Sequence, residues 1–471
     1  MTYVTNHWDR RLGDSARHVA WSRNKMEMLA WTEEFGMLTL FRRVWILVVL
    51  WGFLPSPPAL SQSPALPLTL NDCVGLAESA PSAVRLARQQ RDIANLELKQ
   101  AQAAFLPRTQ LGSGFTYNSP LRENSSLQSF SFVALNGVHE YVSLLSASQE
   151  LDVSGRLRAD RERARAGLAL ARANETITKR DLKRAVAAAY YRLLLARHVA
   201  GALRDSEGEA ESFQKRTQLL LDNGEASQAD LAKASAAVAA LRQAVSAADL
   251  DARLANKELA SFWTAAVNDP IEIVDVFETA PGTEQANIVG GGARPYANRP
   301  EFGLLDAERR GFLAESRRVR AELLPQVNLN FEYGLDSPAL RARDRGYAVF
   351  INLSVPVWDW MRTVNASRVF RVQSEQVDTQ RAMAERVFSR NYEAARARVE
   401  STLEQITLTA QHVKLEEEDL RLSRIRFEGG EGLALDVVTA ENQLAQARVT
   451  YFTAISDYWN AVADLEVASG R

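Results

Sequence analysis

Cysteine and histidine are scarce in this sequence of 471 residues. The single cysteine, Cys73, excludes an intrachain disulfide and a thiolate metal cluster. Five histidines are present, and none belongs to an H-E-x-x-H pair or to another spacing of zinc ligands. The glycine run 290–292 lacks the lysine of a phosphate-binding loop. We therefore expect no catalytic residues, no bound metal and no cofactor, in a protein that is not an enzyme.

Neither sign of charge is in excess. The 56 lysines and arginines nearly balance 58 aspartates and glutamates, which leaves a formal net charge of −2. Such a balance produces no overall field that would attract a polyanion. We expect no nucleic acid partner.

Long apolar runs are also missing. Two arginines precede the 11 apolar residues 44–54, and a stretch of prolines and small residues follows up to Ser61. This order is typical of a secretory signal, and the run is shorter than the roughly 20 residues that span a bilayer. Export is favoured over a membrane anchor. We predict a signal peptide at 37–61, and residues 1–36 are expected to be a mis-assigned start or an extension lost with the signal.

A turn built on glycine, glutamate and aspartate occurs twice, 206 positions apart. Its residues are Gly224, Glu225 and Asp230 in the first copy, and Gly430, Glu431 and Asp436 in the second. After each turn, apolar and small residues follow alternating steps of three and four, over 231–262 and 437–468. This 3.5-residue period is typical of helices that supercoil around their neighbours. The duplication indicates two equivalent helical hairpins in one chain.

The lengths of the helical stretches indicate rods. Two stretches, 155–222 and 361–428, contain 68 residues each and would be roughly 100 Å long as helices. Shorter helices are expected beside them, at 82–104 and 229–264 in the first copy and at 298–322 and 435–469 in the second. Two short helices placed end to end approach the length of one long helix. We divide the chain into a first repeat, 62–264, a connecting segment, 265–297, and a second repeat, 298–469.

Four strands are predicted between the helices. Pro107 and Pro325 end a helix in each copy, since proline cannot continue helical hydrogen bonding. The expected strands are 107–117, 141–151, 325–335 and 347–357. Alternating apolar and polar residues with terminal aromatics are typical of transmembrane β-strands, although one such strand alone would suit a soluble hairpin. Because four strands leave open edges, which a bilayer does not tolerate, we expect an oligomer, and three chains would supply 12 strands.

These residues resemble the TolC-like outer membrane factors of Gram-negative bacteria. The resemblance covers about residues 66–469, and its motifs are Leu68-Thr69-Leu70 before Ala77, the Leu-Pro breaks at 106–107 and 324–325, Arg426-Phe427 before Gly430, and Asp436-Val437-Val438-Thr439-Ala440. It implies a membrane protein of the all-α plus β-barrel class: a homotrimer whose 12-stranded outer membrane β-barrel continues into a long α-helical coiled-coil periplasmic tunnel.

The resemblance also implies a function and a location. The protein would be the exit duct of a tripartite efflux pump or a type I secretion system in the cell outer membrane, with a large periplasmic portion. Its partners would be a periplasmic adaptor protein, an inner membrane transporter and outer membrane lipid. Drug, metal and protein cargoes all remain open.

In that family the repeated turns lie at the periplasmic tip, where helix pairs close the tunnel. The resemblance implies that Asp436 supplies one of three carboxylates in a ring at this aperture, with Glu431 and Glu225 beside it. Such a ring could select cations. Asp230 is a further candidate for the aperture, but its S-x-x-D capping box with Ser227 favours the structural role of capping its helix.

The second turn departs from the first and from the family. Leu433 occupies the capping position, so capping and pore roles both stay open for Asp436. Compared with the family, Gly432 and Thr439 stand where a basic residue and a second acid can occur, which argues against any salt-bridge latch at this tip.

Two other interpretations compete with a duct. A periplasmic coiled-coil adaptor or scaffold without a pore would explain the export signal and the helices, but it leaves the four strands without a purpose. A secreted enzyme on a helical scaffold would need a pocket with perturbed titratable groups, and the sequence supplies no such feature.

Overall fold

The structure of the protein, a computed structural model, describes residues 67–119, 138–277 and 294–470. The expected signal peptide and the extension before it lie outside these residues, as does part of the connecting segment. The chain divides into residues 1–65 and a compact unit of residues 66–471, and the fold of this second unit is described below.

Helices dominate the unit. Those of the first copy are α2 (Leu70–Ser79), α3 (Ala83–Ala103), α4 (Arg156–Asp222) and α5 (Gln228–Ala260). Those of the second copy are α7 (Pro300–Ala321), α8 (Arg362–Glu428) and α9 (Ala434–Ser469), with short 3₁₀ turns η2 (Pro295–Asn298) and η3 (Ala342–Asp344). The two long helices, α4 and α8, each contain 67 residues, one fewer than the sequence pattern indicated.

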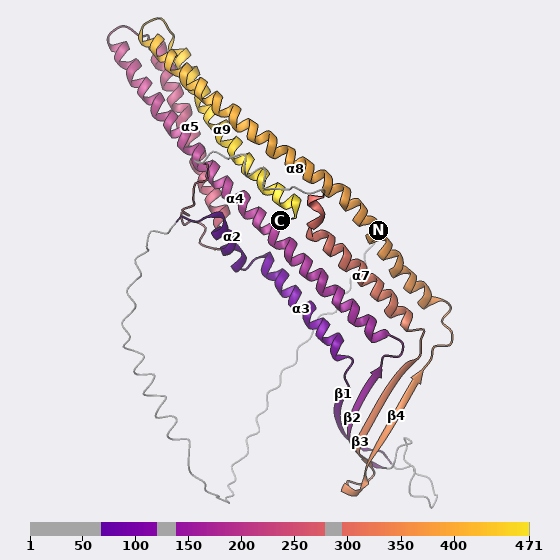
Figure 1. The fold of residues 1–471 in the computed structure, drawn as a ribbon. Helices are drawn as coiled ribbons and strands as arrows, with labels where there is room; N and C mark the ends of the chain where they lie inside the picture. The colour runs from indigo at the N-terminus through magenta and orange to yellow at the C-terminus, as the bar shows by residue number, and fades with distance from the viewer. Residues whose placement is uncertain (1–66, 120–137, 278–293, 471) are drawn as a thin grey trace, which may run out of the picture. The chain divides into compact units, whose positions relative to one another are not determined.

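Each long helix is flanked by two shorter ones. Helices α3 and α5 follow one another along α4, and α7 and α9 do the same along α8 (Figure 1). The two copies also pack against each other, through contacts of α4 with α7 and α9. The repeated turns therefore lie at one end of the helices and the strands at the other (Figure 1).

Helix α2 has no counterpart among the expected helices. Its start is fixed by Thr69 and Asp72, since the Thr69 N–H donates to Asp72 Oδ2 at 2.9 Å and the Asp72 N–H donates to Thr69 Oγ1 at 3.3 Å. This capping box was readable in the sequence as T-x-x-D. One face of α2 buries Cys73 and Ala77 in the core, and burial raises the pKa of the Cys73 thiol to about 11.

The largest core lies midway along the helices. Tyr190 of α4, Leu259 of α5 and Tyr458 of α9 are fully buried there, together with Leu193 and Leu465. The segment after α5 is tied to the same place. Its Val274 carbonyl accepts a hydrogen bond from the Tyr190 hydroxyl at 2.6 Å, and Ile273 forms a parallel bridge with Leu68.

The strands form one antiparallel sheet in the order β1-β2-β3-β4. Their bounds are β1 (Arg108–Tyr117), β2 (His139–Leu151), β3 (Gln326–Ser337) and β4 (Arg345–Ser354). Strand β4 was expected to run to Val357 and instead ends at Ser354. Pro356 explains the early end, because proline has no N–H to donate to a ladder.

The register gives the sheet two different faces. One face carries apolar side chains from all four strands, in rows that include Leu111, Leu145, Tyr333 and Tyr347, then Ala147, Phe331 and Val349, then Leu329 and Ile351. The other face is polar and includes Gln110, Ser146, Ser148, Asn328, Asn330, Glu332 and Asn352. In one chain, β1 and β4 are both open edges.

Candidate functional site at the repeated turns and the sheet

The two repeated turns have the same backbone geometry. Gly224 and Gly430 adopt left-handed φ angles of 79° and 74°, which a residue with a Cβ rarely adopts. The N–H of the following glutamate then reaches back to the last turn of the helix: Glu225 donates to the Leu220 carbonyl at 2.8 Å, and Glu431 to that of Arg426 at 2.9 Å. This pattern is the Schellman end of a helix. Both glycines are therefore needed for the chain to reverse.

The aspartates that follow the turns cap the next helices, but unequally. Asp230 and Ser227 form a complete box, in which the Asp230 N–H donates to Ser227 Oγ at 3.1 Å and the Ser227 N–H donates to Asp230 Oδ2 at 3.2 Å. Asp436 accepts only from the Leu433 N–H, at 3.2 Å, because a leucine side chain offers no acceptor in return. Asp436 is also more exposed than Asp230. Asp436 thus takes part in fewer capping hydrogen bonds than Asp230 and is more accessible to solvent.

The glutamates at the turns are exposed. Within the part of the chain that the structure describes, neither Glu225 nor Glu431 takes part in an ion pair. The second turn also exposes Leu433 and Leu435, where the first has a serine and an alanine. The end of the helices therefore presents uncompensated carboxylates and, on one hairpin, two apolar side chains.

A small apolar core joins the two hairpins just behind the turns. The rings of Phe213 on α4 and Phe427 on α8 meet edge to face, with centroids 5.1 Å apart. Around them pack Ala234 of α5, Leu420 of α8, and Ala434, Val437, Ala440 and Leu444 of α9. We call this group the tip core. Any motion that separates the hairpins at this end must open it.

Charged side chains also cross between the hairpins. Arg424 of α8 contacts Glu441 of α9 at 3.0 Å and Glu209 of α4 at 3.6 Å, and Arg448 of α9 contacts Glu209 at 3.4 Å. A further pair joins Arg216 to another acid, Glu428, at 3.6 Å. Gly432 and Thr439 argue against any salt-bridge latch at this tip, yet ion pairs do join the two hairpins near it. They come from other residues, one to several helical turns further back.

Glu441 is the unusual member of this group. Its side chain is 2% exposed, and Oε2 has no hydrogen-bond partner among the described residues. Burial is the largest influence and raises the pKa of the carboxyl, while the hydrogen bond and charge of Arg424 act in the opposite direction. Sequence patterns gave no sign of Glu441, since its burial depends on how α9 packs against α8 and α4.

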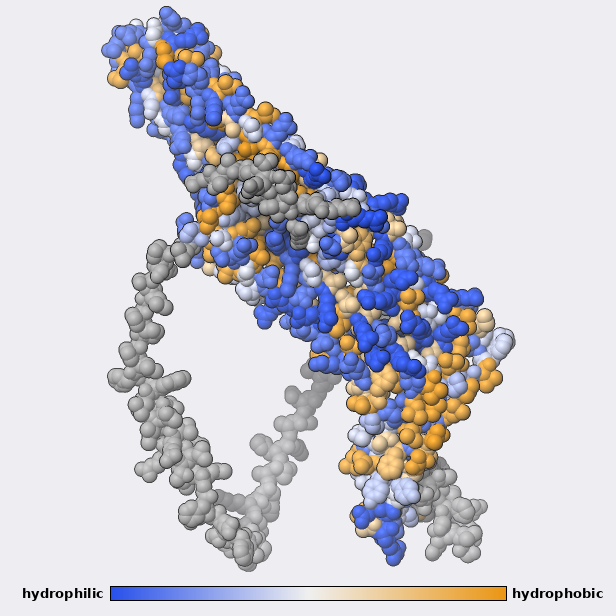
Figure 2. Space-filling view, in the orientation of Figure 1, coloured by the Kyte–Doolittle hydropathy of each residue, from blue (hydrophilic) through white to orange (hydrophobic). Residues whose placement is uncertain are grey.

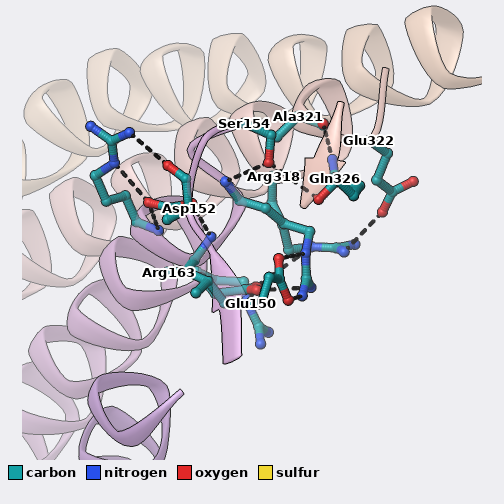
Figure 3. Close-up of polar contacts among 12 residues, drawn as sticks. Glu150, Asp152, Ser154, Arg163, Arg318, Ala321, Glu322 and Gln326 are labelled. Atoms are coloured by element: carbon teal, nitrogen blue, oxygen red, sulfur yellow. Dashed lines mark hydrogen bonds and ion pairs between the residues drawn. The ribbon is translucent and has the colours of Figure 1, made fainter. Parts of the chain in front are cut away.

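Pro107 and Pro325 lie at the other end, where helices give way to strands. Figure 3 shows this junction, in which Gln326 at the start of β3 bonds to both the Ala321 carbonyl at 2.8 Å and Ser154 Oγ at 3.2 Å. Asp152 accepts from the first backbone N–H groups of α4, at 2.9 and 3.2 Å, and so fixes the strand to the long helix. These hydrogen bonds connect the sheet to the helices.

The apolar face of the sheet is exposed in the single chain. Figure 2 shows apolar side chains gathered over the strands and the neighbouring helix ends. Exposed aromatics border this surface on both sides: Tyr347 near the hairpin end, and Trp358 and Trp360 just after β4. A contiguous apolar surface of this size on a soluble monomer marks a contact with another protein or with lipid.

No helix among the described residues is both long enough and apolar enough to cross a bilayer. No group of three or more histidines, cysteines, aspartates or glutamates in these residues is arranged to hold a metal ion.

Comparisons with known proteins agree on one family. The family model for outer membrane efflux proteins matches residues 75–264 and 296–471. No curated protein sequence matches the chain. Among solved structures, the chain is similar to the CmeC outer membrane channel of Campylobacter jejuni, with 16% identity and a TM-score of 0.74 over 85% of each chain.

Two further solved structures have the same fold. VceC, an outer membrane protein of Vibrio cholerae, has 17% identity and a TM-score of 0.72, over 85% of this chain and 96% of its own. The MtrE outer membrane channel of Neisseria gonorrhoeae has 19% identity and a TM-score of 0.70, over 85% of this chain and 88% of its own. The family match confirms the resemblance noted in the sequence. The chain belongs to the outer membrane efflux protein family, and it has the fold of these outer membrane proteins.

Proposed function

We propose that three copies of the chain close into one tube, which is the exit duct of a tripartite efflux pump or a type I secretion system. The observation that carries the proposal is the sheet, which has one apolar face and two open edges, β1 and β4. Open edges are not tolerated in a bilayer. Three four-stranded sheets joined edge to edge would give a closed barrel of 12 strands with the apolar face toward lipid.

The height of the apolar surface supports this placing. Within β4 the alternating apolar residues run from Tyr347 to Leu353, and Val355 and Val357 continue the alternation past its end at Ser354. At about 3.3 Å per residue and a strand tilt of about 40°, the residues inside β4 would cover roughly 18 Å along the membrane normal, and the whole stretch to Val357 would cover at most roughly 28 Å. The apolar band of an outer membrane barrel is about 25 Å high, with aromatic residues at both borders. Tyr347, Trp358 and Trp360 occupy those borders.

The helices would extend the barrel into the periplasm. A helix of 67 residues is about 100 Å long, which is far longer than a globular core requires. At its far end the tip would meet a periplasmic adaptor and an inner membrane transporter. The duct itself has no catalytic role. A periplasmic adaptor without a pore is the weaker alternative, because it leaves the exposed apolar face of the sheet uncovered in water.

Fractionation separates these two functions. We expect the full chain in the outer membrane fraction, extractable only with detergent, and as a species of three chains before heating. A monomer in the periplasmic fraction would overturn the duct.

The exposed Asp436 would form the aperture. In a trimer it would contribute three carboxylates around one axis, with Glu431 nearby. Like charges held together favour bound cations, so the ring would select cations and bind divalent ions. Asp230 offers a matched control, since it occupies the same capping position on the other hairpin.

Single-channel recording tests this role. Asp436→Ala is expected to lower cation selectivity and relieve block by divalent ions, whereas Asp230→Ala is expected to leave both unchanged. Equal behaviour of the two variants would remove Asp436 from the pore.

A further inference from the structure

The turn between β3 and β4 carries a cluster of arginines. Arg341, Arg343 and Arg345 alternate with other residues there, and all three are exposed. The carboxylate of the turn, Asp344, accepts a hydrogen bond from Ser337 Oγ at 3.1 Å and lies 3.8 Å from Arg343 Nε. Among the described residues, Arg341 and Arg345 have no ion-pair partner. The hairpin end of the sheet thus carries three exposed guanidinium groups beside the acids Asp336 and Asp344, and it forms the hydrophilic border of the apolar surface (Figure 2).

Arg345 belongs to the apolar face. It pairs with Leu335 in the ladder, and the next residues on the same face of β4 are Tyr347 and Val349. Its side chain is held beside the turn because Nε donates to the Ala342 carbonyl at 2.8 Å. The two terminal nitrogens have no partner among the described residues. They would therefore lie at the edge of the lipid-facing surface and not inside the barrel.

Aromatic residues fix the depth of this position. Five of them lie on the same face toward the hairpin ends of the strands: Phe115, Tyr117, Tyr141, Tyr333 and Tyr347. Such belts sit at the level of lipid headgroups. Arg345 precedes Tyr347 by two residues, about 7 Å along the strand, and its row of the ladder lies between the row of Tyr347 and the row of Phe115 and Tyr141. Arg345 therefore lies at the headgroup level, and the turn residues Arg341 and Arg343 lie at it or just beyond, on the side of the membrane opposite the helices.

We propose that Arg341 and Arg345, with Arg343 beside them, bind the phosphate group of an anionic glycolipid in the outer leaflet of the outer membrane. Guanidinium groups match phosphate oxygens with two parallel hydrogen bonds, and they keep their charge at any physiological pH. At the border of the apolar surface, the acyl chains of the same lipid would cover the neighbouring tyrosines. This site rests on the proposed placing of the sheet in the membrane.

The test measures lipid binding by the purified full chain in detergent. Lipid A with two phosphates is titrated, and the rise of the thermal unfolding midpoint gives an apparent Kd. Dephosphorylated lipid A and inorganic phosphate are titrated in parallel. Two exposed cationic residues of the periplasmic helices, Arg253 and Lys257, offer a control, because their change to glutamine removes the same charge far from the sheet.

Arg341→Gln with Arg345→Gln should weaken binding of phosphorylated lipid A about 25-fold, since each basic residue at a membrane surface contributes about fivefold. The control pair should bind as the wild type does. The lysine variants at positions 341 and 345 keep the charge and should bind with intermediate affinity, which separates a folding defect from a lost contact.

Three results would overturn the site: unchanged binding by the glutamine pair, equal binding of dephosphorylated lipid A, or an equal response to inorganic phosphate, which would indicate a site for free anions. The oligomeric state of each variant is measured on the same samples. A chain that forms no trimer would contradict the duct, whereas a trimer that ignores lipid phosphate contradicts this site alone.

Discussion

Replacing Arg424 with glutamine removes the partner of a buried carboxylate. Breaking one side of a fully buried ion pair costs about 3–5 kcal/mol. Here the Glu441 side chain is 2% exposed, whereas that of Arg424 is 35% exposed, so water screens one half of the pair. We therefore expect a loss of about 2 kcal/mol in the free energy of unfolding at neutral pH.

The Arg424–Glu441 pair also predicts that the free energy of unfolding depends on pH. Burial raises the pKa of Glu441 above its ordinary value of 4.5, so the folded protein holds this proton more tightly than the unfolded chain. The contribution of Glu441 is therefore most favourable below about pH 4.5, and it declines as pH rises through the folded pKa. Without Arg424 the folded pKa rises further. Arg424→Gln should consequently be more destabilised at pH 8 than at pH 5. The free energy of unfolding of Glu441→Gln should lose this dependence on pH and stay within about 1 kcal/mol of the wild-type value.

Unfolding followed by circular dichroism at pH 5 and pH 8 measures both effects. Arg421→Gln is the matched control, since this arginine lies one turn away on α8 and pairs with the exposed Glu418. It should leave stability unchanged at both pH values. Equal losses of unfolding free energy for Arg421→Gln and Arg424→Gln would show that Arg424 does not compensate the buried Glu441. A loss for Arg424→Gln that is the same at both pH values would show the same.

Three further predictions concern stability. Phe213→Ala and Phe427→Ala should each lower the free energy of unfolding by about 3 kcal/mol, because each opens the tip core. The double variant should lose less than the sum because the two rings touch, and additive losses in denaturant unfolding would contradict this packing. Gly430→Ala should cost about 1 kcal/mol because of its left-handed φ, whereas Gly208→Ala, inside α4 with open space around its Cβ, should gain about 0.5–1 kcal/mol. Thr69→Ala should remove the cap of α2 and cost about 1 kcal/mol, seen as faster hydrogen exchange in that helix.

The helices and strands were largely predictable because their patterns are local. The 3.5-residue period over long stretches placed α4 and α8 within a residue of their ends. Alternation placed the four strands, and Pro356 was the available sign that β4 would stop early. The short helix α2 was missed although its T-x-x-D cap is visible, because ten residues are too few for a clear period.

The polar part of the tip was much less predictable. Phe213 and Phe427 are not equivalent positions of the repeat, and Glu209 is more than 200 residues from Arg424 and Glu441. Their meeting depends on how α4 packs against α8 and α9, which periodicity does not specify. The capping of Asp230 could be predicted from Ser227 alone. For Asp436 the sequence left two roles open, and the hydrogen bond from Leu433 to one carboxylate oxygen is compatible with both.

In the proposed duct, β4 of one chain pairs with β1 of the next until three chains close into one barrel. Cysteine cross-linking in outer membranes tests it directly, in a Cys73→Ala background that removes the single native thiol. One cysteine is introduced in β1 as Gly112→Cys, where an added Cβ meets open space. It is combined in turn with a cysteine at position 346, 348, 350 or 352, on the same face of β4. The account predicts that at least one register gives a covalent species of three chains and nothing larger. Monomers at every register, or a ladder that continues beyond three chains, would contradict it.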